Sequence, residues 1–267
     1  NAVREVRTYE IPELGNAKVT EVSHEGGALE PDLRSWVRDT SLTDQRKSLT
    51  DYADRIYSGP LDTYATTPAD DLTHPFEMTL TVQHAKRAQT HWSKAEIWLY
   101  PSDTLARIDR ALRDTDAPAR KHDLAILVPH TYEIENRIVL PDGFTIPKPA
   151  PDRTLEVGAY RIVEHQRVDG QTLVVTYRLS AEKLRLTPPE VTATIHAAHD
   201  PRDEEEHIDR AGHAVHRAVD RNGLARTRSW IVVVDYCSSD ATASCAWLAL
   251  GDRREVLRSA LGEVLVR

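Results

Sequence analysis

The alternation of apolar and polar residues along the chain predicts several short strands. Residues 3–10 and 17–24 alternate in this way, and turn residues separate the two segments. The same period of two recurs in residues 76–84 and 92–100, with residues 85–89 expected as the turn between them. Because successive side chains of a strand point to opposite faces, each pair of segments predicts a β-hairpin with one apolar face.

A helical spacing of apolar residues predicts two helices between these hairpins, over residues 31–38 and 41–56. Ser41 is suited to cap the free amides of the second helix, and Asp44 three residues later completes a capping box. The pattern also predicts a polar loop to residue 71 and a short helix that begins at Ser102.

Further strands are expected in the next part of the chain. Residues 132–140 alternate, and residues 159–168 face residues 171–179 across Asp169-Gly170, a two-residue hairpin signal. Residues 191–196 are expected to add a last strand. Several short strands with turn signals about every ten residues favour a small β-sandwich.

These elements predict an α+β, strand-rich fold. We expect an antiparallel sheet with helices on one face over residues 1–116, followed by a small β-sandwich over residues 117–200. Residues 201–267 are expected to form a helix-strand-helix tail, and the pattern leaves the packing of this tail open.

Charge and composition exclude some functions. The chain has 34 Lys and Arg against 42 Asp and Glu, a net charge of −8, which argues against a general binder of nucleic-acid phosphates. No apolar run approaches the length of about 18 residues that a membrane-spanning helix needs, so no membrane span is expected. The chain begins with Asn1 and its only methionine is Met78, from which we expect a piece of a longer polypeptide.

Histidines in the last third of the chain are candidate metal ligands. His213 and His216 are three residues apart, which places both on one face of a helix, and His207 lies nearby in the sequence. Glu206 or Asp209 would supply a carboxylate, since zinc-like metals accept imidazole nitrogen together with carboxylate oxygen. A charged, exposed helix with scattered histidines is the alternative, and no other cofactor is expected.

The two cysteines, Cys237 and Cys245, leave three interpretations open. They fit burial as small apolar residues, or a disulfide with each other, which would indicate an oxidising compartment. The third interpretation is an activated Cys245 thiolate, whose base would come from earlier in the chain because no histidine follows Cys245.

Three aromatic residues, Trp92, Trp98 and Tyr100, are candidates to line a groove for a peptide or a glycan. Trp98 and Tyr100 fall on the strand face opposite Ile97 and Leu99. A strand that is apolar on both faces needs cover on both, either from another element of the chain or from a ligand.

Several short motifs occur in a characteristic order: Arg7-x-Tyr9, Gly15-x-Ala17, Asp71-Leu72 with Pro75-Phe76, Ala117-Pro118-x-Arg120, Arg137-Ile138-Val139-Leu140-Pro141-Asp142-Gly143 and Asp169-Gly170. In this order and spacing, residues 3–199 resemble a segment of large exported or envelope-associated bacterial proteins. This segment is a domain of unknown function that follows their transglutaminase-like domain. Residues 201–267 are not covered by the resemblance.

The resemblance implies a non-catalytic accessory module. In such proteins the chemistry belongs to a Cys, His and Asp set in the transglutaminase-like core, so no catalytic residue is carried over to this chain. The implied roles are packing, substrate presentation or partner binding, with the rest of the longer polypeptide, a peptide or a glycan as partner, in the periplasm, the envelope or outside the cell. The alternative is a hydrolase or metalloenzyme whose site lies in the histidine-rich tail.

Overall fold

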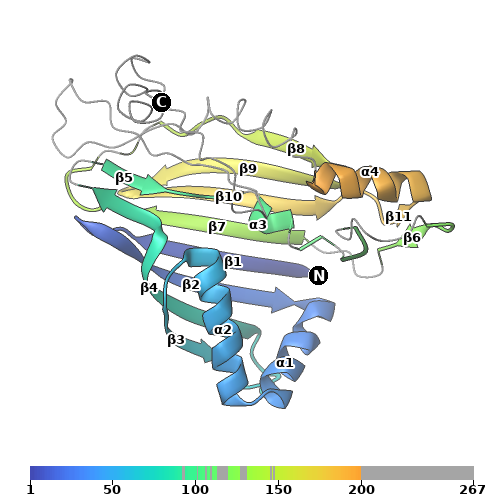
Figure 1. Cartoon of the computed structure of the whole chain (residues 1–267), viewed down its shortest axis with the longest axis horizontal. Helices are drawn as coiled ribbons and strands as arrows, with labels where there is room; N and C mark the ends of the chain where they lie inside the picture. Colours follow the sequence, from blue (N-terminus) through green and yellow to red (C-terminus); the bar gives the residue numbers. More distant parts are fainter. Residues whose placement is uncertain are drawn as a thin grey trace, which may run out of the picture.

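The fold is built on one large mixed β-sheet (Figure 1). The computed structural model describes residues 1–91, 94–100, 102–105, 107–108, 110–112, 120–126, 131–144, 146 and 148–199. The sheet has nine strands, eight of them in the order β3-β4-β2-β1-β7-β10-β9-β8, with β5 paired to β4. These strands are β1 (Ala2–Glu10), β2 (Gly15–Gly26), β3 (Leu61–Thr66), β4 (Phe76–His91), β5 (Lys94–Ile97), β7 (Thr131–Val139), β8 (Arg153–Val157), β9 (Tyr160–Asp169) and β10 (Thr172–Ala181).

Helices and one small ladder complete the described part. The helices are α1 (Glu30–Asp39), α2 (Leu42–Tyr57), α3 (Ser102–Leu105) and α4 (Pro188–His199), with 3-10 turns η1 (Gly27–Leu29) and η2 (Arg110–Leu112). A separate two-stranded ladder joins β6 (Leu124–Ala125) to β11 (Arg185–Leu186). The predicted cap of the second helix is confirmed, because the Asp44 amide donates to Ser41 Oγ at 3.2 Å.

The sheet continues across the expected boundary between residues 116 and 117. β1 pairs with β7 in parallel, from Ala2 opposite Thr131 to Glu10 opposite Val139, while the other described pairs are antiparallel. The α+β, strand-rich class is confirmed. The strands assigned to a separate sandwich instead extend the first sheet in the described residues, because an apolar alternation identifies the buried face of a strand but not its neighbour.

The predicted hairpin of residues 76–84 and 92–100 and the predicted polar loop before it need correction. The expected turn at residues 85–89 lies within β4, which continues to His91 past a bulge where His84 has a φ of 51°. The expected strand over residues 92–100 is shorter, since β5 ends at Ile97. β3 lies inside the expected polar loop, where Thr and Asp concealed its strand pattern.

The strand expected over residues 191–196 is also wrong, because this segment lies in the helix α4. Glu190 caps the start of this helix, because the amide and the Oγ1 of Thr187 both donate to Glu190 Oε2 at 2.9 Å. Two prolines occupy the first turn, where a missing amide hydrogen costs no hydrogen bond. The β-branched run after them imitates a strand, and the capping residues outweigh it.

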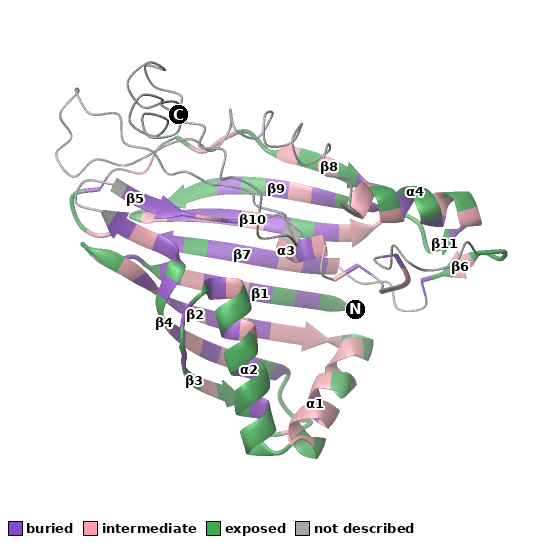
Figure 2. Cartoon of the chain, in the orientation of Figure 1, coloured by how far each residue is buried: buried purple, intermediate pink, exposed green. Residues whose placement is uncertain are grey.

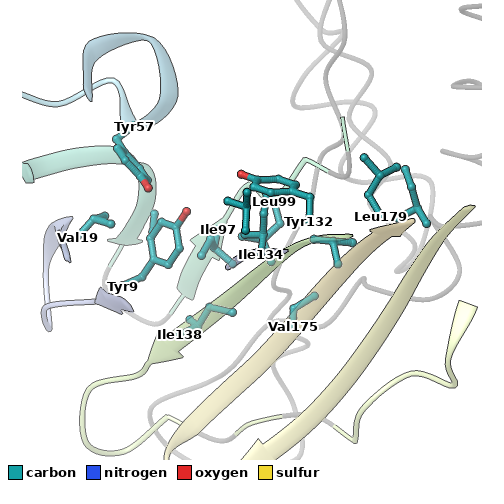
Figure 3. Close-up of a cluster of buried hydrophobic side chains, with 14 of the residues drawn as sticks. Tyr9, Val19, Tyr57, Ile97, Leu99, Tyr132, Ile134, Ile138, Val175 and Leu179 are labelled. Atoms are coloured by element: carbon teal, nitrogen blue, oxygen red, sulfur yellow. The ribbon is translucent and has the colours of Figure 1, made fainter. Parts of the chain in front are cut away.

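Buried and more exposed residues alternate along the strands (Figure 2), so the two faces of the sheet differ in burial. On β1, Val3, Glu5, Arg7 and Tyr9 are buried, while the residues between them are exposed or half-buried. We call the face that carries these four residues the inner face and the opposite face the outer face. Apolar side chains of the inner face form the core shown in Figure 3, including Val19, Ile97, Leu99, Tyr132, Ile134, Ile138, Val175 and Leu179.

Candidate functional site

Charged residues lie in the middle of the inner face, where apolar side chains are expected. Glu5 and Arg7 on β1 are 1% and 3% exposed, and Glu21 on β2 is 3% exposed. The strand register places Arg7 directly opposite Glu21 on one side and Asn136 on the other. A sequence signal for this cluster exists, because Glu5 and Arg7 share the period of two with Val3 and Tyr9.

Arg7 is the centre of the cluster. Its Nη2 donates to Glu5 Oε2 at 2.8 Å, and its Nη1 donates to Asp103 Oδ2 at 2.6 Å. Its Nε lies 3.2 Å from Glu21 Oε2, close enough for charge attraction but without a hydrogen-bonding alignment. One guanidinium therefore connects β1, β2 and α3.

Two further arginines join this network. Arg87 on β4 donates to Asp103 Oδ2 at 2.7 Å and to the carbonyl oxygens of Ile56 and Trp98 at 2.8 Å each. Arg107 donates to Glu5 Oε1 at 2.5 Å, and its guanidinium lies 4.8 Å from the centre of the Tyr132 ring. We call Glu5, Arg7, Glu21, Arg87, Asp103 and Arg107 the buried ionic cluster.

Tyrosines of α2 close the cluster over Glu21. Tyr52 donates to the two Glu21 oxygens at 3.1 and 3.0 Å, and the Tyr57 hydroxyl donates to Oε2 of the same carboxylate. Tyr57 also meets the ring of Tyr9 edge-on, with 6.2 Å between ring centres (Figure 3). Because Leu49, Ala53 and Tyr57 are buried on the same helix, α2 contacts the sheet through both apolar and polar side chains.

The pKa values of Glu21 and Glu5, two carboxylates of the cluster, are shifted in opposite directions. Burial raises the pKa of Glu21, and the charge of Glu5 adds to this, while Arg7 and the tyrosine hydrogen bonds oppose it. Burial also acts to raise the pKa of Glu5, but Arg7 and Arg107 outweigh it and hold the pKa below its usual value. Glu5 is thus the carboxylate that the arginines keep charged.

The cluster balances three arginines against three carboxylates, so its formal charge is zero. Each member contacts an oppositely charged member, and four elements (β1, β2, β4 and α3) supply residues to it. Buried ion pairs add little net stability compared with apolar packing, but breaking one leaves an uncompensated charge. The chemistry that this geometry supports is the fixing of α2, Trp98, α3 and Arg107 on the sheet in one arrangement.

Trp98 and Tyr100, two of the predicted binding residues, lie beside the cluster. The Trp98 amide donates to the Arg87 carbonyl at 2.9 Å, and Arg87 Nε donates back to the Trp98 carbonyl. The Arg87 guanidinium lies 4.5 Å from the centre of the Tyr100 ring. Both aromatic residues are half-buried, and their proposed role in binding a peptide or glycan stays a prediction.

The other predicted site residues lie outside the described residues. These are Trp92, the metal candidates His207, His213 and His216, and the cysteines Cys237 and Cys245. Within the described ranges, no group of three or more His, Cys, Asp or Glu residues could hold a metal ion. In the same ranges, no helix has the length and apolar character needed to cross a membrane.

Comparison of the chain with protein-family models, with curated proteins and with solved structures finds no significant match. The arguments for function therefore come from the residues and from their geometry.

Proposed function

We propose that this chain is a non-catalytic accessory module of a larger bacterial polypeptide that carries a transglutaminase-like core. The observation that supports this proposal is that the buried charges pair with one another. The arginines and carboxylates of the inner face bind one another and anchor helix and loop segments, as in a scaffold. On the outer face of the same sheet most residues are exposed or half-buried, and the arginines of its four middle strands are exposed, which suits contacts with a partner.

In this proposal the module packs against the rest of the longer polypeptide and presents a peptide or glycan substrate or binds a partner. The periplasm, the envelope or the exterior of the cell is its location. The family assignment rests on the motif order that ends with residues 137–143 and Asp169-Gly170, and the scaffold role rests on the ionic cluster.

The reading frame that encodes the chain tests the family assignment directly. We expect the sequence before Val3 to encode a transglutaminase-like domain with a cysteine, a histidine and an aspartate in the order of that family. An upstream sequence without such a set would remove the transglutaminase-like context.

Metal analysis tests the proposal that the module is non-catalytic. The alternative is a hydrolase or metalloenzyme whose site lies in the histidine-rich tail. The purified chain would be measured for transition metals, together with a His213→Ala variant as the matched comparison. A stoichiometric metal that the variant loses would replace the accessory proposal with the metalloenzyme alternative. Equal, substoichiometric metal in both proteins is the expected result.

A further inference from the structure

Four arginines lie close together on the outer face, on four different strands. They are Arg4 on β1, Arg137 on β7, Arg167 on β9 and Arg178 on β10, and all four are exposed. We call them the arginine patch. Arg4 and Arg178 both lie opposite Glu133, one from each neighbouring strand. Since adjacent strands are about 4.8 Å apart, the backbones of these two arginines are about 10 Å apart.

The second pair has the same arrangement. Arg137 and Arg167 both lie opposite Val174 of β10. Val174 is only 2% exposed although it belongs to the outer face, which is expected when long arginine side chains lie across a small apolar residue. The burial of Val174 therefore fits cover by the apolar stems of Arg137 and Arg167.

Two glutamates share the space between the arginines. Arg4 contacts Glu133 at 3.3 Å and Glu135 at 2.9 Å, and Arg137 contacts Glu135 at 2.5 Å. Arg167 approaches Glu135 less closely, at 3.9 Å. Arg167 also lies 3.6 Å from Asp169. Four arginines against Glu133, Glu135 and Asp169 leave a local charge of +1, on a chain whose net charge is −8.

Arg178 is the least satisfied member. Its guanidinium has no ion pair or side-chain hydrogen bond with any residue in the described part of the chain, although it is exposed beside Glu133. The ion pairs of Arg167 are long, at 3.9 Å to Glu135 and 3.6 Å to Asp169, and surface pairs of this kind contribute little, so its guanidinium can turn to another anion at small cost. The patch therefore has one cation without a partner in the described residues, Arg178, and one weakly held cation, Arg167.

We propose that the arginine patch binds an acidic segment of a partner polypeptide. A local charge opposite in sign to that of the whole chain selects an anionic partner. Glu133 and Glu135 disfavour a uniformly charged polyanion, which would place negative groups beside them, whereas a polypeptide can place carboxylates opposite the arginines and neutral groups opposite the glutamates. This inference rests on the proposed role as a binding module and names its surface and the chemistry of its partner.

The test measures binding of a synthetic peptide of alternating Glu and Ser to the whole chain by calorimetry at low salt. We expect binding that weakens as sodium chloride is added. The Arg178→Gln variant should bind several-fold more weakly, and Arg137→Gln with Arg178→Gln about tenfold more weakly. The control is Arg38→Gln, which removes an exposed arginine of α1 that pairs with Asp39 and lies on an element outside the patch.

The outcomes separate the possibilities. Equal weakening in the Arg38→Gln control, or no binding by the natural chain, would overturn the proposed binding by the arginine patch. Tighter binding of heparin fragments or inorganic phosphate than of the peptide would also overturn the proposal. Glu133 and Glu135 would then not favour a polypeptide over other anions. Thermal unfolding of each variant verifies that it is folded. The binding measurements are independent of the sequence before Val3, which tests the proposed function. Failure of the arginine patch is therefore distinguishable from failure of the proposed function.

Discussion

Asp103 in α3 and Arg7 in β1 are 96 positions apart in the sequence, and Asp103 Oδ2 lies 2.6 Å from Arg7 Nη1. The same carboxylate oxygen also accepts from Arg87. This one side chain therefore joins the N-terminal hairpin, β4 and the segment after β5, and its removal is the most direct test of the buried ionic cluster.

We expect Asp103→Ala to lower the free energy of unfolding by about 3 kcal/mol, because two buried guanidinium groups lose their shared partner. Urea unfolding measures the change. Asp51→Ala is the matched control, since Asp51 pairs with Lys47 on the exposed side of α2, and its cost should be about 0.5 kcal/mol or less. Similar costs for the two variants would show that the cluster does not anchor the segment.

The opposite pKa shifts of Glu21 and Glu5 predict opposite pH dependences. Glu21 has a raised pKa in the folded chain, so the folded state holds its proton more tightly and its contribution to stability falls as pH rises above about 4.5. Glu5 has a lowered pKa, so its contribution is present above about 4.5 and is lost as pH falls through the folded value.

Unfolding curves at several pH values for the natural chain, Glu21→Gln and Glu5→Gln measure this prediction. The stability of the natural chain relative to Glu21→Gln should decrease with rising pH, and relative to Glu5→Gln it should increase. Slopes of the same sign in both comparisons would contradict the assigned directions.

Gly158 is a described glycine whose replacement should be costly. Its φ is +58°, and an added Cβ would lie 2.4 to 2.7 Å from atoms of Thr194 on α4. The Thr194 hydroxyl also accepts the Ala159 amide at 3.1 Å, so α4 packs tightly against this turn.

Gly158→Ala should therefore displace α4 as well as strain the turn, with a loss of about 3 kcal/mol in the free energy of unfolding. Gly170 has the same φ with nothing within 4 Å of an added Cβ, so Gly170→Ala isolates the backbone strain, about 1 kcal/mol. Thermal or urea unfolding of both variants gives the comparison. Equal losses would mean that α4 does not press on the turn.

Arg34 of α1 holds the loop that precedes β4. It donates to the carbonyls of Pro68 and His74 at 3.1 and 2.7 Å, and its guanidinium lies 5.4 Å from the centre of the Phe76 ring. Lysine keeps the charge but lacks the planar fork that reaches both carbonyls.

Arg34→Lys should cost about 1 to 2 kcal/mol in the free energy of unfolding and speed amide exchange in residues 67–75. Arg38→Lys, at an exposed position of the same helix, should change neither quantity noticeably. Unchanged exchange in residues 67–75 of the Arg34→Lys variant would show that the loop is held by other contacts.

Local patterns determined much of the fold. The first hairpin, the helix capped by Ser41 and the strands on either side of Gly170 are present within a few residues of their predicted bounds. The period of two in residues 171–179 puts Leu173, Val175, Tyr177 and Leu179 on one face, and these four residues of β10 are buried. Each of these features depends on residues close in the sequence, where side-chain period, capping and turn conformation act directly.

The tertiary structure alone decided which strands are neighbours and which residues pair with the buried charges. The parallel pairing of β1 with β7 is made by backbone groups that every residue carries, so no side-chain pattern specifies it. Glu5 and Arg7 reveal only that charges share a buried face; the partners that neutralise them, Glu21, Asp103 and Arg107, come from other elements. The sequence by itself thus determined the local elements and the buried faces, and long-range pairing decided the single sheet and its buried ionic cluster, because burial of a charge depends on partners that only the folded chain brings together.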